Sequence, residues 1–243
     1  MNPVCLTIGG SDSSAGAGVQ ADLNTFSSHG MKGCSAITAL TAQTPVDISR
    51  IENAPLEQLE AEIRAIFAYY EVKAVKTGML VDAERIRLIA SLLGSLHFNK
   101  LLIVDPVMVS TSKTHLLDDD GVRTLWEKLF PLATLITPNI PEAECLLGRS
   151  ASDPLEDVAE LVMRTKTAVL LKGGHGQGDH LMDVLCERTG EVSIFEHNRR
   201  DWDKECGHGS GCCLASAITT HLAMGLAVDD AVQKSIDWLQ ERS

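Results

Sequence analysis

Short runs of apolar, often β-branched residues alternate with amphipathic segments along the whole chain. The runs show little polar alternation, which is typical of strands that are covered on both faces. The segments between them carry apolar residues at helical spacing, as at Val19, Leu23 and Phe26. Strands that alternate with helices favour parallel pairing, so the pattern predicts an α/β fold with a mostly parallel central sheet and helices on both faces.

The expected elements follow from this pattern and from the Gly, Pro and Asn residues that interrupt it. We expect strands at residues 4–8, 34–42, 74–76, 101–104, 135–137 and 167–171, and an antiparallel pair at 181–186 and 192–195. Helices are expected at residues 19–29, after 53–55, at 83–93, near 122–129, after Pro141 and Pro154, and at 211–224 and 229–240.

Composition narrows the class of protein. The 243 residues suit one large α/β domain, and no repeat, linker or low-complexity tract divides them, so we expect a single domain over residues 1–243. The net charge of −12 and the absence of a dense basic patch argue against nucleic acid as a partner. No apolar stretch is long enough to span a bilayer, so no membrane association is expected.

The seven cysteines are scattered, and none forms a C-x-x-C pair. Neither a disulfide framework nor a zinc site is therefore indicated. The N-terminus lacks the basic residues and long apolar run of a signal peptide. These features predict a soluble protein of the reducing cytoplasm.

A Gly-rich segment, CGHGSGC at residues 206–212, leads directly into an apolar helix. Glycines let the backbone approach a ligand closely, and the free amides of a helix start favour an anion. The helix dipole is expected to lower the pKa of the Cys212 thiol, which could then act as a base. The alternative is an ordinary helix entry with a packed cysteine.

A second Gly-rich turn, GGSDSSAGAG at residues 9–18, follows the first strand. It matches neither the G-x-x-x-x-G-K-[ST] phosphate loop nor a clean G-x-G-x-x-G. A flexible strand–helix connection is the alternative interpretation. In open α/β sheets ligands bind at the carboxyl ends of the strands, so we expect the site where the loops after Ile8, Ala42, Lys76, Val104 and Thr137, and the loop after Leu171, converge.

Together these segments resemble one family, the hydroxymethylpyrimidine/phosphomethylpyrimidine kinases of thiamine synthesis. The matching motifs occur in the family's order from residue 6 to about residue 225: LTIGGSDSSAGAGVQADL at 6–23, ITALTAQ at 37–43, KTGML at 76–80, VDPVM at 104–108, TPNIPEA at 137–143, KGGH at 172–175 and HGSGC at 208–212. The resemblance implies a three-layer ribokinase-like fold. It also implies ATP-dependent phosphorylation of 4-amino-5-hydroxymethyl-2-methylpyrimidine and of its monophosphate.

The resemblance places the pyrimidine on one side of the site. Gln43 and Asp22 would bind the polar edges of the ring, and Gly10, Met79 and Val107 would line the pocket. A carboxamide can pair donor-to-acceptor with an aminopyrimidine, which makes the assignment of Gln43 chemically reasonable.

The nucleotide side is implied in the same way. Asn139 and Glu142 would position Mg²⁺ and phosphate oxygens, and carboxylate and amide oxygens suit that ion. The alternative is that these two residues cap a helix. Lys172 would reach the ATP phosphates, against the alternative of a solvated loop lysine, and Asp105 would belong to the same phosphate and metal side.

The transferring phosphoryl group would lie on the loop of Gly209, Ser210 and Gly211, with Cys212 as the base. This sequence departs from the family at Gly207, where threonine is usual, and it ends at Ser243, earlier than most members. Two alternatives to the pyrimidine kinase remain open, a pyridoxal kinase and a non-catalytic pyrimidine-binding sensor. A homodimer is the expected assembly.

Overall fold

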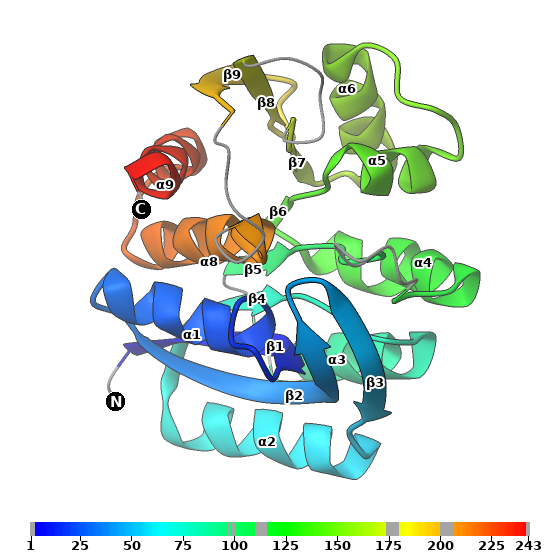
Figure 1. The fold of residues 1–243 in the computed structure, drawn as a ribbon, viewed down its shortest axis with the longest axis vertical. Helices are drawn as coiled ribbons and strands as arrows, with labels where there is room; N and C mark the ends of the chain where they lie inside the picture. Colours follow the sequence, from blue (N-terminus) through cyan, green and yellow to red (C-terminus); the bar gives the residue numbers. More distant parts are fainter. Residues whose placement is uncertain are drawn as a thin grey trace.

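The computed structural model describes residues 3–96, 98, 101–109, 116–173, 180–199 and 207–241, and its centre is one sheet of nine strands within that part of the chain (Figure 1). The strand order is β3-β2-β1-β4-β5-β6-β7-β8-β9. Their bounds are β1 Pro3–Asp12, β2 Lys32–Thr44, β3 Asp47–Asn53, β4 Glu71–Thr77, β5 Leu101–Val104, β6 Leu135–Ile136, β7 Ala168–Leu171, β8 His180–Cys186 and β9 Val192–Asn198.

Parallel pairing joins all neighbours from β2 to β7, while β3, β8 and β9 pair antiparallel at the two edges. The predicted mostly parallel sheet and the predicted antiparallel pair β8–β9 are therefore confirmed. Cys206 and His175, which belong to two of the sequence motifs, lie outside the described residues.

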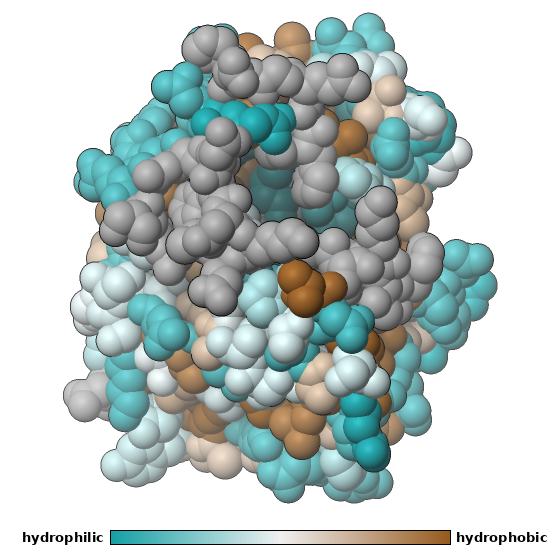
Figure 2. All heavy atoms as spheres, viewed as in Figure 1, coloured by the Kyte–Doolittle hydropathy of each residue, from teal (hydrophilic) through white to brown (hydrophobic). Residues whose placement is uncertain are grey.

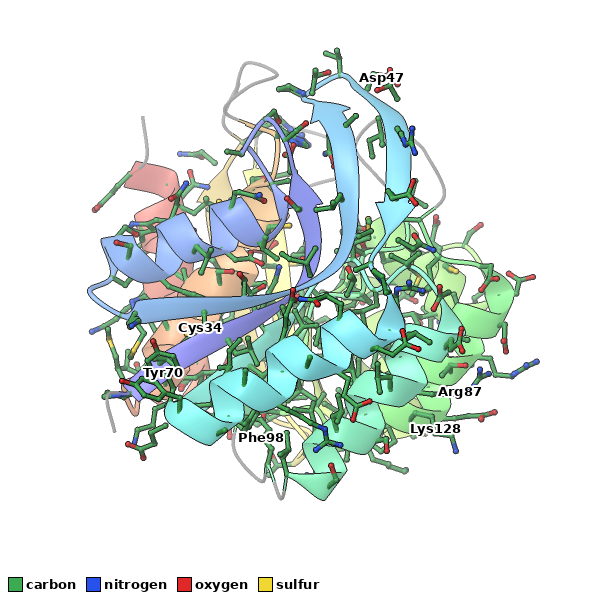
Figure 3. All side chains as sticks on the ribbon, turned by 90° about the horizontal axis from the view of Figure 1, so that it is seen from below. Cys34, Asp47, Tyr70, Arg87, Phe98 and Lys128 are labelled. Atoms are coloured by element: carbon green, nitrogen blue, oxygen red, sulfur yellow. The ribbon has the colours of Figure 1, made fainter. Side chains whose placement is uncertain are left out.

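Helices cover both faces of the sheet, and Figure 3 shows α1 and α2 on opposite sides of β2. One face carries α1 Gly18–Ser28, α8 Ser210–Ala223 and α9 Val228–Glu241. The opposite face carries α2 Leu56–Tyr69, α3 Ala83–Ser95, α4 Asp119–Thr124, α5 Ile140–Leu147 and α6 Pro154–Thr165. None of the helices in the described ranges is long and apolar enough to cross a membrane.

The two cores follow from the alternation of side chains along each strand. In β1, Leu6 and Ile8 pack in the core that contains Leu59 and Ile63 of α2, whereas Cys5 packs with α1 on the other face. Because both faces are buried, the strands read as continuous apolar runs in the sequence.

Three elements differ from the prediction. Strand β1 continues to Asp12, into the Gly-rich segment that was expected to be a turn. Strand β3 was not predicted, because most of its side chains are exposed at the sheet edge and the segment carries no apolar run. The hairpin tip at Asp47 lies at the far end of β2 from Cys34 and Tyr70 (Figure 3). The helix predicted near residues 122–129 is α4 followed by a π-helical turn, Leu125–Leu129, and a 3₁₀ turn, Phe130–Leu132.

Candidate active site

A cavity of about 410 Å³ opens at the carboxyl ends of the parallel strands. The loops after β1, β2, β4, β5, β6 and β7 line it together with the start of α8, as the sequence predicted. The face in Figure 2 is hollowed near its centre, with hydrophilic residues inside the hollow. Every site residue named from the sequence lines this cavity: Gly10, Asp22, Gln43, Met79, Asp105, Val107, Asn139, Glu142, Lys172, Gly209, Ser210, Gly211 and Cys212.

Gly10 and Met79 form one wall. A Cβ atom built on Gly10 would lie 2.9 Å from the Met79 Cε atom, so the methionine occupies the space that a side chain at position 10 would need. The Thr38 hydroxyl donates to the Met79 carbonyl at 2.6 Å and fixes the loop that carries it. This wall is apolar and closely packed, and Val107 adds to the apolar lining.

Gln43 lies near the end of β2, at the cavity, and its carboxamide contacts two neighbouring side chains. One end lies 3.0 Å from the Thr41 hydroxyl and the other end 3.1 Å from His208 Nε2. His208 Nε2 also lies 2.8 Å from the Asp12 carboxylate, so this nitrogen must carry the proton that it shares with Asp12. The structure places the carboxamide oxygen at Thr41 and the NH₂ group at His208. The opposite orientation of the amide fits these protons better: its oxygen then accepts from His208, and its NH₂ group donates to Thr41, whose own proton goes to the Ser11 carbonyl.

That orientation leaves Gln43 with one N–H and one carbonyl lone pair for a ligand. A donor and an acceptor are therefore available side by side at the cavity.

Protein groups engage the carboxylate of Asp22 at the cavity, and its expected role as a substrate ligand stays a prediction. Its two oxygens each lie 3.0 Å from the Lys76 ammonium, and they also accept from Thr7 at 2.6 Å and Ser216 at 2.7 Å. A carboxylate has about four lone-pair positions, so protein groups occupy all of them. Asp22 is 1% exposed and Lys76 is fully buried, which makes this a buried ion pair beneath the cavity.

Lys76 keeps its charge in this position. Burial by itself would lower the pKa of its ammonium, but Asp22, the Cys212 sulfur and Asp105 together raise that pKa above its usual value. A cation is therefore held under the cavity floor, and a Cβ atom on Gly78 would lie 3.1 Å from its Nζ atom.

Lys172 and Asp105 form a second buried pair at the cavity. Lys172 Nζ is 2.8 Å from Asp105 Oδ1, and Thr137 donates to the same oxygen at 3.2 Å. Burial opposes the charged ammonium, but Asp105 and Glu142 raise the pKa of Lys172. Lys172 is 9% exposed, so the alternative of a solvated loop lysine is wrong.

Asn139 and Glu142 form a capping box at the start of α5. The Asn139 side chain accepts from the Glu142 amide at 2.9 Å, and Glu142 Oε2 accepts from the Asn139 amide at 2.8 Å. The capping interpretation is therefore confirmed. Burial raises the pKa of Glu142 to about 7 even though Lys172 lowers it, so this carboxyl gains and loses its proton near neutral pH.

The anion loop, residues 207–211, precedes and begins α8. Gly209 is the N-cap of the helix and has a φ of +78°, a conformation that favours glycine. A Cβ atom on Gly211 would lie 3.4 Å from Lys172 Nζ, so the first turn of the helix faces that ammonium. Free helix amides next to a lysine make this part of the cavity electropositive, which favours an anion.

Cys212 lies in the first turn of α8 and faces the cavity, whereas Cys213 is buried. The expectation of a lowered thiol pKa is wrong. Burial raises the pKa of Cys212 to about 12, and Asp22 and Asp105 add to this, although Lys76 and a hydrogen bond from the Gly18 amide oppose it. The helix dipole is therefore outweighed by the loss of water around the sulfur.

Three residues of the site were not singled out from the sequence, namely Asp12, Lys76 and His208. Each stands inside a motif that was recognised, but no role was assigned to it. A lysine at the end of an apolar strand was the clearest available signal, because a buried lysine needs a partner.

Sequence comparison relates this chain to known proteins of a single family. The family model of phosphomethylpyrimidine kinase matches residues 12–242. The hydroxymethylpyrimidine/phosphomethylpyrimidine kinase of Rhizobium meliloti (strain 1021) is 42% identical, with 98% of this chain and 90% of that protein covered. The enzyme of the same name from Bacillus subtilis (strain 168) is 38% identical, with 97% and 87% covered.

Solved structures show the same architecture. A phosphomethylpyrimidine kinase from Clostridium difficile 630 superimposes with a TM-score of 0.85 at 37% identity and covers 99% of both chains. An ADP complex of Bacillus subtilis pyridoxal kinase superimposes with a TM-score of 0.86 at 32% identity, over 98% of this chain and 90% of that one.

Proposed function

Because this chain belongs to the phosphomethylpyrimidine kinase family, we propose that it transfers the γ-phosphoryl group of ATP to the hydroxymethyl oxygen of 4-amino-5-hydroxymethyl-2-methylpyrimidine, and then to the phosphate of the product. The observation that carries this proposal is the convergence of the anion loop, Lys172 and Cys212 on the cavity that also holds Gln43 and Met79.

Phosphoryl transfer depends mainly on positioning the reactants and on neutralising charge around the transferred group. The free amides at the start of α8 and the Lys172 ammonium supply positive charge where the transferred group would lie. Cys212 would take the proton of the substrate hydroxyl as the oxygen forms its bond to phosphorus. Lys76 lies beneath the cavity and favours the thiolate form that this step needs.

Members of a kinase family use ATP, and relatives have been solved with ADP and with AMP-PCP. We further propose that Glu142 and Asn139 would hold Mg²⁺, which would neutralise charge on the ATP phosphates. In the described residues no group of three or more His, Cys, Asp or Glu side chains could hold a metal ion. Mg²⁺ bound through one carboxylate, water and substrate phosphates fits that donor set, because this ion keeps several of its waters.

Replacement of Glu142 by glutamine tests the metal role. Glutamine retains an acceptor for the Asn139 amide but removes the negative charge. We expect a large loss of activity at low Mg²⁺ that is partly recovered as Mg²⁺ is raised, with unchanged helix content by circular dichroism. Loss of the fold instead of activity would show that Glu142 acts only as a cap.

The thermal stability of the same variant, measured without metal, provides a control. The pKa of Glu142 is about 7 in the folded chain against an ordinary value of 4.5, so the folded state binds more protons than the unfolded state between these values. Its contribution to stability is present at pH 4.5 and is lost as the pH rises through 7. In EDTA, the Tm of the wild type minus the Tm of Glu142→Gln should therefore decrease as the pH rises from 4.5 through 7.

Replacement of Gln43 by alanine tests substrate recognition. We expect kcat/KM for the pyrimidine to fall by an amount corresponding to roughly 1–3 kcal/mol, because polar atoms of the bound ring lose their partner. The KM for ATP and the Tm should change little. An unchanged kcat/KM for the pyrimidine would remove Gln43 from the site.

The activity itself is tested by ADP release with the free pyrimidine, its monophosphate and pyridoxal side by side. We expect the highest kcat/KM with the pyrimidine and measurable turnover of the monophosphate. A preference for pyridoxal would assign the chain to the other substrate class. Calorimetric binding of the pyrimidine without ADP release at high enzyme concentration would indicate a sensor.

We also propose that the whole chain acts as one kinase domain, in the cytoplasm and as a homodimer. The single sheet that joins residues 3 to 198 supports one domain, and the six cysteines of the described ranges are all free thiols, which suits a reducing compartment. Light scattering coupled to size-exclusion chromatography measures the assembly.

A further inference from the structure

Two loops from opposite ends of the chain touch through glycines beside the cavity. The loop after β1, residues 13–17, meets the anion loop, residues 207–211. A Cβ atom on Gly209 would lie 2.1 Å from the Gly16 carbonyl oxygen, and one on Gly16 would lie 2.5 Å from the His208 ring. The contact therefore requires glycine on both sides.

Asp12 organises the first of these loops. Its carboxylate accepts from the Ser14 amide, the Ser14 hydroxyl and the Ala17 amide, each at 2.8 Å. His208 Nε2 donates to it as well, also at 2.8 Å. Burial opposes the charge of Asp12, but these donors hold its pKa below the usual value, so the carboxylate is ionised.

His208 is the link that comes from the anion loop. Its side chain is 4% exposed, and within the described residues its Nδ1 atom is buried without a hydrogen-bond partner. The ring is thus held by Nε2, which meets both Asp12 and the Gln43 carboxamide. Burial of a polar ring nitrogen without a partner costs free energy, so the Nε2 contacts must offset that cost.

The loop after β1 leads directly to Gly18, the residue that contacts Cys212, the proposed base. Gly18, directly after the first loop, begins α1, and its backbone amide hydrogen-bonds the Cys212 sulfur. Its φ is +61°, and a Cβ atom there would lie 2.4 Å from the Gly10 carbonyl oxygen. The position of this amide therefore depends on the path of residues 13–17, which Asp12 sets.

We infer that His208 and Asp12 form a clasp that holds the anion loop against the loop after β1 and keeps the Gly18 amide on the Cys212 sulfur. Both are then positioning residues for the phosphoryl transfer, acting through Gly18 and the anion loop. The catalytic part of this inference rests on the proposed function, but the contact between the loops does not.

The kinetic test compares two substitutions of the same residue. His208→Leu removes the donor to Asp12, and we expect kcat to fall about 10-fold to 100-fold, because small displacements of reacting groups cost that much. The KM for ATP should change little. His208→Gln restores a donor and should recover most of kcat.

His221, a half-buried histidine on α8, provides a control. His221 is hydrogen-bonded to Ser235 at 2.9 Å and does not line the cavity. His221→Leu should lower the Tm without changing kcat. A double-mutant cycle of Asp12→Asn and His208→Leu should be non-additive, with the pair no slower than the slower single variant.

Hydrogen exchange followed by mass spectrometry gives a readout that needs no activity. In His208→Leu we expect faster exchange in peptides covering residues 13–18 as well as 207–211, with the rest of α8 unchanged and with protection restored in His208→Gln. Unchanged exchange at residues 13–18, or an unchanged kcat in His208→Leu, would overturn the clasp. A wild-type enzyme that releases no ADP would instead refute the proposed function and leave the exchange result to decide the clasp.

Discussion

Cys212→Ala is expected to lower kcat by about 10²-fold to 10⁴-fold, the contribution that a positioned base typically makes. Substrate binding should be nearly unchanged, because the anion loop, Lys172 and the wall formed by Gly10 and Met79 remain in place. Single-turnover phosphoryl transfer and calorimetric binding of the pyrimidine would separate the two effects. An unchanged kcat would eliminate the cysteine-base mechanism.

The neighbouring cysteine supplies the control. Cys213 is 4% exposed and lies about 100° further round α8, so it does not line the cavity. Cys213→Ala should leave kcat unchanged. Cys212→Asp is expected to retain part of the activity, because an aspartate in the first turn offers another proton acceptor.

The raised pKa of Cys212 adds a second measurement to the same prediction. With a pKa of about 12 the ligand-free thiol is almost wholly protonated at neutral pH. Its alkylation rate in the empty enzyme should therefore increase with pH and show no plateau below pH 9. A plateau near neutral pH would mean that Lys76 and the helix amides outweigh burial.

Asp22→Ala is expected to destabilise the fold by about 3–5 kcal/mol, the usual cost of leaving one charge of a buried pair without its partner. Lys76 would lose the carboxylate that contacts its ammonium, and the Thr7 and Ser216 hydroxyls would lose their acceptor. In a chain of this size each kcal/mol corresponds to roughly 2–4 °C, so the Tm should fall by on the order of 10 °C.

Removing both charges should restore most of this stability. Asp22→Leu/Lys76→Met replaces the pair by apolar groups, which is often neutral for the fold. Glu60→Ala breaks the exposed Arg64–Glu60 pair and should change the Tm very little, since such pairs contribute less than about 1 kcal/mol. If Asp22→Ala left the Tm unchanged and raised only the KM for the pyrimidine, Asp22 would be a substrate ligand after all.

The alternation of strands and helices could be predicted from the sequence because both faces of the sheet are buried, so that its inner strands are continuous apolar runs. Strand β5 was predicted with the bounds that the structure shows, since Leu101–Val104 is a short apolar run with no competing helical period. Strand β3 was missed because Asp47–Asn53 lies at an edge, where exposed polar residues carry no such signal. Burial on both faces is what makes a strand visible in a sequence.

The site could be located from the sequence for a topological reason. The carboxyl ends of parallel strands meet at one edge, so residues as distant as Gly10 and Lys172 were expected together and line one cavity. The role of each residue in the cavity was harder to predict from the sequence. The ion pair of Asp22 with Lys76, for example, joins residues 54 positions apart and cannot be inferred from spacing.

The sequence by itself determined the α/β architecture, the place of the cavity and the residue types that line it, because periodicity and loop position depend on local chain geometry. Only the tertiary structure decided the charge states and the pairings. Burial, a property of all the surrounding elements, raised the pKa of Cys212 against the local effect of its helix. Folding also brought His208 to Asp12 across 196 positions, because hydrogen bonds between loops depend on where the sheet places them.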